Sequence, residues 1–254
     1  MISKSTIKLI KSLAIKKYRT REQLFLVEGD KMVAEVLQSQ LKVKELICTN
    51  EFTSFLEKKS PAIEKTTIVN HKELKQASLL NNPQNSLAIC RIPKPKSFPA
   101  KLSGTLSIYL DGIQDPGNLG TIIRICDWFG VEDVFCSPDS VDLYNPKVIQ
   151  ASMGSFNRIN YRESEFSQLQ TLAKNSGTQL YGAFMDGKNI YSETLPQNAL
   201  LVMGNEGNGI RKEVETLIDK RISIPNLSSN KEKAESLNVS VATAIICSEF
   251  KRLQ

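Results

Sequence analysis

Three short segments of this sequence place polar side chains and glycines directly after runs of apolar residues. The first segment, 110–130, contains Asn118, Gly120 and Arg124. An arginine one helical turn after a glycine leaves room for a phosphate oxygen to approach the guanidinium. A single helical arginine is also commonly exposed to solvent without a ligand, so this spacing alone leaves both interpretations open.

The second segment, 201–210, runs from an apolar stretch into a loop that contains Gly204, Glu206 and Gly209. Glycines adopt positive φ angles and let a ligand come close to the backbone, and a carboxylate held among them can contact that ligand or accept a proton. Three glycines within six residues favour a ligand-binding loop over an ordinary turn. The spacing is neither the dinucleotide fingerprint nor a P-loop.

The third segment, 222–245, contains Ile224 and Pro225, then a polar stretch, then Ser236 and Asn238 before a helical pattern. Serine and asparagine satisfy free N–H groups at the start of a helix. Helix capping alone therefore accounts for both side chains, and a role in chemistry is the alternative.

Alternating strands and helices are expected to position these segments. The apolar runs 106–110, 131–136, 178–184 and 199–203 are typical of strands buried on both faces. Helical patterns are expected over 118–129, 164–174, 211–219 and 240–252. This alternation predicts an α/β domain with a mainly parallel sheet, whose ligands bind at the carboxyl ends of its strands. All three segments follow such strands, so we expect them to build one pocket.

A second, smaller α/β domain is expected before it, with strands at 24–27, 43–48 and 86–90 and helices at 31–37 and 70–78. Three prolines then predict a linker, because proline fixes φ and disfavours helix in the residue before it. The expected organisation is a basic segment over 1–22, a small domain over 23–92, a linker over 93–104 and a larger domain over 105–254.

The net charge of +6 is unevenly distributed. Residues 1–21 carry seven basic side chains and no acidic one, among them Lys16, Lys17, Arg19 and Arg21. Such a cluster attracts polyanions such as RNA by releasing condensed counterions, although a solvated amphipathic helix explains the same pattern.

Other compositional features exclude several classes of protein. The five cysteines are scattered and odd in number, so we expect free thiols, with no disulfide framework and no metal site. No apolar run approaches the length of roughly 20 residues that a membrane helix needs, and the N-terminus has no signal-peptide pattern. A cytoplasmic protein that does not associate with membranes is expected.

Taken together, the three segments resemble the motifs of the SpoU family, the TrmH-like ribose methyltransferases of the SPOUT superfamily. The family motif N-x-G-x-x-x-R is similar to 118–124, G-x-E-G-x-G is similar to 204–209, and I-P followed by S-L-N-V-S is similar to 224–225 and 236–240. The ends of the small domain also resemble those of the family's substrate-binding domain, which is similar to ribosomal protein L30e.

The resemblance implies a C-terminal domain with a trefoil knot, a homodimer formed through that domain, and transfer of a methyl group from S-adenosylmethionine to a ribose 2′-hydroxyl of structured RNA. Ribosomal RNA, in particular 23S, is the expected substrate, with transfer RNA as the alternative. The implied cofactor contacts are Met203, Gly204, Gly209, Ile224, Pro225 and Leu237. The implied catalytic residues are Asn118, Arg124, Glu206, Ser236 and Asn238. RNA binding is expected at Lys16, Lys17, Arg19, Arg21 and Arg124.

The proton acceptor is left open by the sequence. Arginine stays protonated, so we expect Arg124 to bind a phosphate and the developing oxyanion and to take part only in relaying the proton, with Glu206 as the alternative base. The loop 226–235 is longer than is usual in the family and has no glycine. That departure supports the alternative of a non-catalytic RNA-binding or ribosome-assembly protein. The missing dinucleotide fingerprint counts against a third alternative, a Rossmann-type enzyme.

Overall fold

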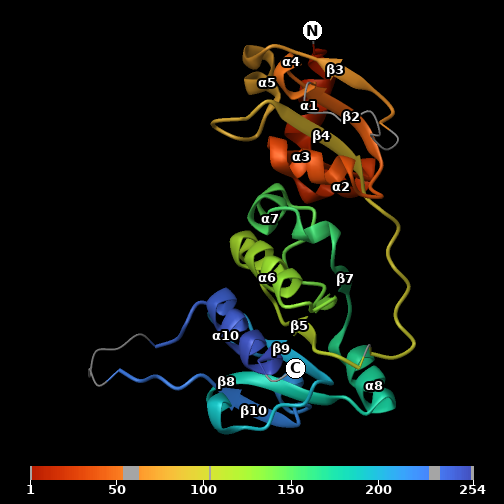
Figure 1. Cartoon of the computed structure of the whole chain (residues 1–254). Helices are drawn as coiled ribbons and strands as arrows, with labels where there is room; N and C mark the ends of the chain where they lie inside the picture. Colours follow the sequence, from red (N-terminus) through yellow and green to blue (C-terminus); the bar gives the residue numbers. More distant parts are fainter. Residues whose placement is uncertain (1, 54–62, 103, 229–234, 253–254) are drawn as a thin grey trace. The chain divides into compact units, whose positions relative to one another are not determined.

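The computed structural model describes residues 2–53, 63–102, 104–228 and 235–252. The chain divides into two compact units, 1–94 with 142–157, and 95–141 with 158–254. The sequence patterns had assigned 142–157 to the larger C-terminal domain, whereas in the structure this segment groups with the N-terminal unit. Figure 1 shows the elements of both units, which are described separately below.

The N-terminal unit contains a four-stranded sheet in the order β1-β4-β2-β3. Strands β1 and β2 are antiparallel to β4, and β3 is parallel to β2. The strands are β1 (Leu24–Glu28), β2 (Val43–Cys48), β3 (Thr66–Ile68) and β4 (Ser86–Arg91). The helices are α1 (Lys4–Ser12), α2 (Lys16–Glu22), α3 (Asp30–Leu37), α4 (Asn50–Thr53), α5 (His71–Ala77) and α7 (Pro146–Ser152), followed by the 3-10 turn η1 (Ser155–Asn157).

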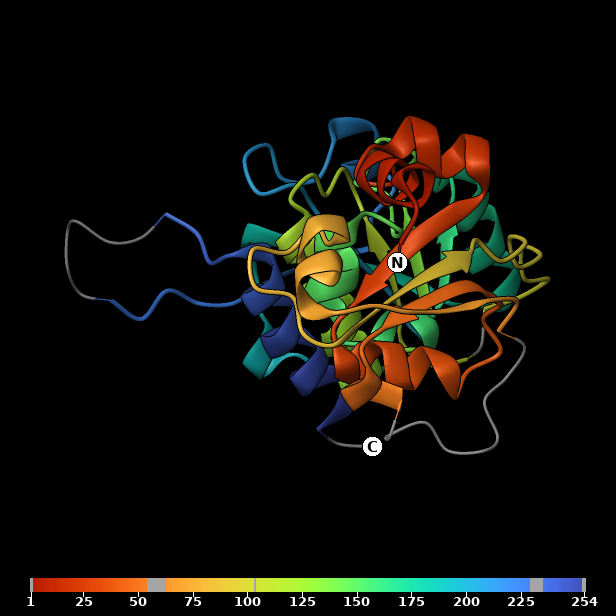
Figure 2. The same cartoon turned by 90° about the horizontal axis from the view of Figure 1, so that it is seen from above.

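Strand alternation places helices on both faces of this sheet. Leu24 and Leu26 of β1 pack with α1 and α5 in one apolar cluster. Phe25 points to the other face, where its ring contacts Tyr144 and Phe156. Figure 2 shows α1 and α3 on opposite sides of the strands.

A polar network ties the end of β1 to the segment that leads into β4. The Glu28 carboxylate accepts hydrogen bonds from Ser78 Oγ and the Leu79 N–H. The Asp30 carboxylate accepts from the Asn85 N–H at 2.9 Å and from Ser86 Oγ at 2.7 Å. The two segments that resemble the ends of the family's substrate-binding domain therefore hold each other in place.

The C-terminal unit contains a six-stranded sheet in the order β10-β8-β9-β5-β6-β7, with every neighbouring pair parallel. Its strands are β5 (Ser107–Leu110), β6 (Asp133–Cys136), β7 (Asn160–Glu163), β8 (Gln179–Asn189), β9 (Ala199–Met203) and β10 (Lys220–Ser223). Its helices are α6 (Pro116–Trp128), α8 (Phe166–Ser176), α9 (Lys212–Glu215) and α10 (Val239–Lys251), with the 3-10 turn η2 (Ile190–Ser192). The predicted α/β class and parallel sheet are confirmed.

Helices cover this sheet on both faces. Phe166 and Leu169 of α8 pack in one cluster with Tyr109 of β5 and Leu200 of β9. On the other face α6 and α10 pack against each other, and the ring of Phe250 at the end of α10 contacts Tyr181 of β8. The loops that follow β5 and β9 start at the carboxyl ends of adjacent strands, and β10 lies two strands beyond β9.

Candidate active site

A chain of side-chain hydrogen bonds joins all three segments singled out from the sequence. Asn118 Nδ2 donates to Glu206 Oε1 at 2.7 Å, and Asn238 Nδ2 donates to Asn118 Oδ1 at 2.9 Å. These residues come from the first turn of α6, from the loop after β9 and from the residue before α10. Residues 88 and 120 positions apart in the sequence are thereby fixed against one another.

Helix caps set the positions of the two asparagines. Asp115 caps α6, and its Oδ1 accepts the Asn118 N–H at 2.8 Å. Asn238 caps α10, and its Oδ1 accepts the Ser240 N–H at 2.9 Å. Asn238 therefore caps the helix through its oxygen, while its nitrogen makes the link to Asn118.

The loop after β9 is closed by its own backbone. Asn205 and Gly209 exchange two N–H···O=C hydrogen bonds of 3.0 Å. Gly209 has a φ of +68°, and a Cβ on Gly204 would lie 2.3 Å from the carbonyl carbon of Gly209. Glycine is therefore required at both positions, one for its conformation and one for its close packing. Glu206 is exposed at the tip of this loop.

A cavity of about 780 Å³ opens beside this loop. Its wall includes all six residues expected to contact a cofactor, which are Met203, Gly204, Gly209, Ile224, Pro225 and Leu237, and also Glu206 and Ser236. Asn118 and Asn238 do not line the cavity. Asn118 bonds to Glu206, which does line it, and Asn238 bonds in turn to Asn118. The volume lies within the range of ordinary small-molecule sites, roughly 300–1,000 Å³.

Strand β8 contributes a wall that the sequence patterns did not reveal. Its pairing with β10 shifts register, so that Gly182 pairs with Arg221 but Lys188 pairs with Ile222. Residues 183–185 lie in this irregular stretch and line the cavity. Continuous apolar runs signal a buried strand, but they do not signal a change of register within it.

The charge of the cavity wall is one-sided. Among the described lining residues the only charged side chains are Glu206 and Glu235, and none is basic. Apolar side chains such as Phe184, Met203 and Ile246 make up much of the remaining surface. Such a wall suits a ligand that combines an apolar ring system with a positive charge.

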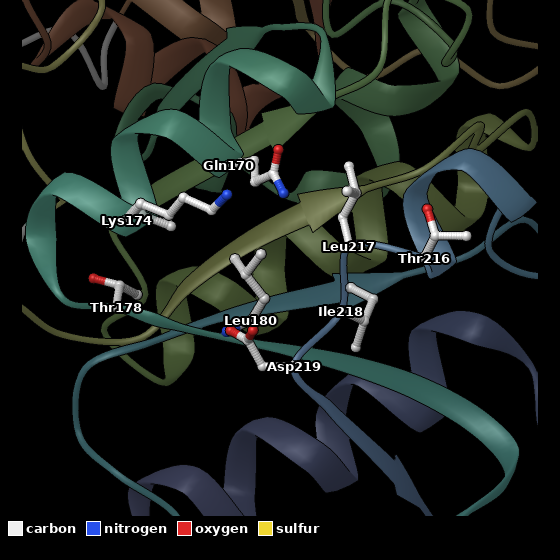
Figure 3. Close-up of a pocket in the computed structure, with 9 residues that line it drawn as sticks. Gln170, Lys174, Thr178, Leu180, Thr216, Leu217, Ile218 and Asp219 are labelled. Carbon is white, nitrogen blue, oxygen red and sulfur yellow. The ribbon is translucent and has the colours of Figure 1, made fainter.

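A second cavity, of about 240 Å³, lies between α8 and the segment 216–219. Figure 3 shows Gln170, Lys174 and Asp219 around it. It contains none of the residues that sequence analysis selected, so we do not assign chemistry to it.

Arg124 stands apart from the linked asparagines. Along an ideal helix it lies about 9 Å further on than Asn118 and about 120° around the axis. Its side chain is exposed and makes no hydrogen bond or ion pair with any residue that the structure describes. Gly120 is buried in the helix packing, so it does not open the space beside Arg124 that the sequence suggested. Arg124 is free to meet a ligand, but it is not part of the cavity wall.

Comparison with known proteins decides the family. Residues 105–248 match the model of the SpoU rRNA Methylase family, and residues 4–88 match that of the MRM3-like substrate binding domain. The chain belongs to the SpoU rRNA methylase family. It is an enzyme of the methyltransferase class, as the three motifs indicated.

Relatives of this SpoU methylase align along nearly its whole length. The 23S rRNA (guanosine(2553)-2′-O)-methyltransferase RlmP of Bacillus subtilis is 31% identical over 93% of this chain and 92% of its own. A TrmH-family protein from Porphyromonas gingivalis has 37% identity and a TM-score of 0.89, with both chains fully covered. An AdoMet-bound rRNA methyltransferase from Sinorhizobium meliloti has 25% identity and a TM-score of 0.84, covering 100% of this chain and 97% of that one.

The basic residues near the N-terminus of this SpoU methylase divide into two groups. Lys16, Lys17 and Arg21 are exposed. Arg19 is only 2% exposed, and its guanidinium donates to the Leu13 carbonyl at 2.7 Å and pairs with the carboxylate of Asp142. The prediction that Arg19 binds RNA is therefore wrong, because this side chain faces the interior of the N-terminal unit.

The cysteines, possible metal sites and possible membrane-spanning helices of the SpoU methylase can be checked in the same way. All five cysteines are free and buried, and burial raises the pKa of the Cys48 thiol to about 11 and that of Cys247 to about 12. Within the described ranges, no group of three or more histidine, cysteine, aspartate or glutamate side chains could hold a metal ion. In those same ranges no helix has both the length and the apolar character to cross a membrane.

Proposed function

We propose that this protein transfers a methyl group from S-adenosylmethionine to a ribose 2′-oxygen of 23S ribosomal RNA. The observation that carries the proposal is the convergence of the three motif segments, where Glu206 both lines the large cavity and bonds to Asn118. The name of the B. subtilis relative, whose alignment extends over both units, supports ribosomal rather than transfer RNA.

The cavity fits S-adenosylmethionine chemically. Phe184, Ile222 and Ile246 provide apolar surface for an adenosine ring, and the loop 204–209 brings backbone close to it. The carboxylates of Glu206 and Glu235 balance the positive charge of a sulfonium, with no basic side chain competing among the described wall residues. When bound, the cofactor supplies an electrophilic methyl group.

The chain's own residues then have to orient the ribose and take its proton. Glu206 uses Oε1 to accept from Asn118, while Oε2 has no partner among the described residues and can accept the hydroxyl proton. Arg124, exposed on α6, would bind an RNA phosphate and stabilise negative charge near the reacting oxygen. Ser236, at the cavity wall, would contact the ribose or the cofactor. Orientation of this kind supplies about 7–11 kcal/mol of the barrier in favourable cases.

We further propose that the enzyme works as a homodimer through its C-terminal unit, and that this unit carries the trefoil knot of its superfamily. Exposed apolar side chains on α6 and α10 support a dimer face, since Trp128 is 84% exposed and Val241 is also exposed. Trp128 is the only tryptophan in the sequence. Its emission should therefore move to longer wavelength when a dimer dissociates on dilution. A monomer at every concentration in sedimentation would refute this assignment.

The N-terminal unit is proposed to bind the RNA substrate, as its match to a substrate-binding domain suggests. Lys16, Lys17 and Arg21 on α2 are exposed and can contact RNA phosphates. The described part of the chain offers no membrane-spanning helix, and we propose that the enzyme acts in the cytoplasm, where ribosomal RNA is found.

Mapping of ribose methylation across total RNA tests the proposed function. Cells that lack the protein should lose 2′-O-methylation at a 23S ribosomal RNA position, and the wild-type gene should restore it, whereas a gene encoding Asn118→Ala should not. Loss at a transfer RNA position would contradict the ribosomal assignment. An unchanged methylation map, together with no binding of S-adenosylmethionine by the purified protein, would instead identify a non-catalytic RNA-binding protein.

A further inference from the structure

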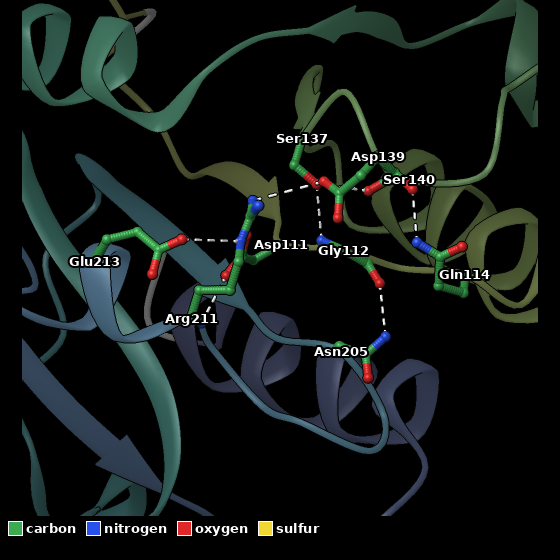
Figure 4. A network of polar contacts seen from close by, with 9 residues as sticks. All are labelled: Asp111, Gly112, Gln114, Ser137, Asp139, Ser140, Asn205, Arg211 and Glu213. Carbon is green, nitrogen blue, oxygen red and sulfur yellow. Dashed lines mark hydrogen bonds and ion pairs between the residues drawn. The ribbon is translucent and has the colours of Figure 1, made fainter.

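The loop that carries Glu206 is fastened at both ends to a single turn after β5. At its start, Asn205 Nδ2 donates to the Gly112 carbonyl at 2.7 Å. At its end, Arg211 makes three hydrogen bonds to the Asp111 carboxylate, from its backbone N–H at 2.8 Å, from Nε at 2.8 Å and from Nη2 at 2.5 Å. Figure 4 shows both attachments on the same dipeptide.

Between these attachments the loop is cross-linked by hydrogen bonds of its own. The Asn205 side-chain oxygen accepts the N–H groups of Gly207 at 2.9 Å and Asn208 at 3.1 Å. Together with the paired backbone bonds between Asn205 and Gly209, these contacts leave little internal freedom. The loop can therefore change position mainly by releasing an end, and the Arg211 end carries the larger number of bonds to side chains.

The negative charge of the buried Asp111 carboxylate is balanced by the Arg211 guanidinium. The Asp111 side chain is fully buried, whereas that of Arg211 is partly exposed. A buried carboxylate is costly without a partner, and the hydrogen bond to Asp111 raises the pKa of the Arg211 guanidinium. The turn that holds Asp111 is supported by the residue that follows β6, because Ser137 Oγ accepts the Gly112 N–H at 2.8 Å. The pair therefore ties the loop to a fixed part of the sheet.

Neither Asp111 nor Arg211 lines the large cavity. Any influence on a bound cofactor must pass through the loop 204–210, which contributes Gly204, Glu206 and Gly209 to the cavity wall. If only a fraction of the molecules held the loop in its binding conformation, the apparent affinity for the cofactor would fall by that fraction. A loop that already has this conformation avoids the loss.

We propose that Arg211 is a positioning residue which, through Asp111, holds the loop 204–210 in its cofactor-binding conformation before S-adenosylmethionine arrives. The pair sets the affinity for the cofactor and has little effect on the chemical step. This inference rests on the proposed cofactor site, because neither residue of the pair lines the cavity itself. Arg211 also lies 3.6 Å from Asp139 and 3.9 Å from Glu213, both of which are exposed, whereas its contacts with the buried Asp111 are shorter.

Titration of S-adenosylmethionine into Arg211→Ala tests the proposal. If the loop then adopts its binding conformation in about a tenth of molecules, the dissociation constant rises about ten-fold, while kcat at saturating cofactor changes little. Arg211→Lys should bind with intermediate affinity, because an ammonium keeps the charge but cannot make the two-pronged contact.

Arg162→Ala is the matched control. Arg162 of β7 pairs at 2.7 Å with Asp133 of β6, an aspartate that is also largely buried. Neither residue lines the large cavity. This variant should lose thermal stability and keep its affinity for S-adenosylmethionine. A purely structural role for Arg211 would make the two alanine variants behave alike.

The outcomes separate this inference from the proposed function. An Arg211→Ala protein that binds S-adenosylmethionine as tightly as wild type would overturn the role of Arg211. A wild-type protein that does not bind the cofactor would instead refute the cofactor site itself. If Arg211→Ala fails to fold, amide hydrogen exchange at Gly207 and Asn208 in Arg211→Lys decides the question. Faster exchange than in wild type is expected, and unchanged exchange would overturn the proposal.

Discussion

Asn238 offers a substitution that separates structure from function at a single atom. Its Oδ1 caps α10 by accepting the Ser240 N–H, and its Nδ2 donates to Asn118. Asn238→Asp keeps an oxygen for the cap and replaces the donating nitrogen with a second acceptor. Asn118 Oδ1 then faces a carboxylate oxygen of the substituted side chain, and two acceptors cannot form a hydrogen bond. Rotating the Asn118 side-chain amide by 180° would relieve this contact but would place Asn118 Oδ1 against the Glu206 carboxylate. The chain of hydrogen bonds cannot be repaired locally.

The expected magnitudes follow from these two roles. Removing a cap costs about 1 kcal/mol, so Asn238→Ala should lower the melting temperature by about 2–4 °C, whereas aspartate caps as well as asparagine. One net hydrogen bond is worth about 1 kcal/mol, so breaking the link should lower kcat/KM at least about five-fold. Misplacement of Glu206 could extend that reduction to about a hundred-fold.

The assay is single-turnover methyl transfer, paired with a thermal melt of each variant. We expect Asn238→Asp to have the melting temperature of the wild type but a much lower rate of methyl transfer. Asn238→Ala should have both a lower melting temperature and a lower rate. Full activity in Asn238→Asp would show that the link to Asn118 is not needed for the reaction. A melting temperature as low as that of Asn238→Ala would show that the cap has been assigned to the wrong atom.

Four further predictions follow from other parts of the molecule. Arg124→Ala should abolish methyl transfer and leave the dissociation constant for S-adenosylmethionine unchanged, because Arg124 lies outside the cavity wall; surviving activity would remove it from the reaction. Replacing Lys16, Lys17 and Arg21 with alanine should lower the salt slope of RNA binding, as fluorescence anisotropy can measure, by about one for every replaced side chain that binds an RNA phosphate in the wild type. Arg19→Ala should instead leave that slope unchanged and destabilise the fold by about 3–5 kcal/mol in denaturant titrations, because it leaves Asp142 unpaired. Burial raises the pKa of Glu28 above its value in the unfolded chain, so its contribution to stability is fully present at low pH and is lost as pH rises through the raised pKa. Glu28→Gln should therefore flatten the dependence of unfolding free energy on pH above about 4.5, the ordinary pKa of a glutamate, and an unchanged dependence would contradict this account.

The parallel sheet could be predicted because its central strands are buried on both faces. Strands such as β5 and β9 are continuous apolar runs, which leave a clear signal in the sequence. Strand β7 has the sequence NYRE and lies at the edge of the sheet, so it shows neither an apolar run nor a clean alternation. An edge strand of this kind is fixed by pairing with β6, which the local sequence does not encode.

The error at Arg19 has a similar origin. Counting charges treats every basic residue of an amphipathic helix alike, whereas the face that is buried depends on contacts made far along the chain. The partner of Arg19 is Asp142, 123 positions away. The same long-range contacts place the segment 142–157 in the N-terminal unit, although the strand pattern around it suggested the other one.

The site was predicted in part. Motif spacing identified residues that do line the cavity, because the backbone geometry there requires glycine at positions 204 and 209, and this requirement leaves a mark in the sequence. The joint role of Asn238 was not resolved, since a capping residue looks the same whether or not its nitrogen has a partner. The irregular stretch of β8 at 183–185 was missed because a change of register has no local signature.

The central claim is that the three motif segments build a single cofactor site beside Glu206. A crystal structure with S-adenosylhomocysteine tests it most directly. Electron density for the ligand should lie between residues 183–185 of β8 and the segment 222–228, with its sulfur on the side of Glu206. Density in the smaller cavity near Lys174 and Asp219, or anywhere out of contact with the loop 204–209, would contradict the account.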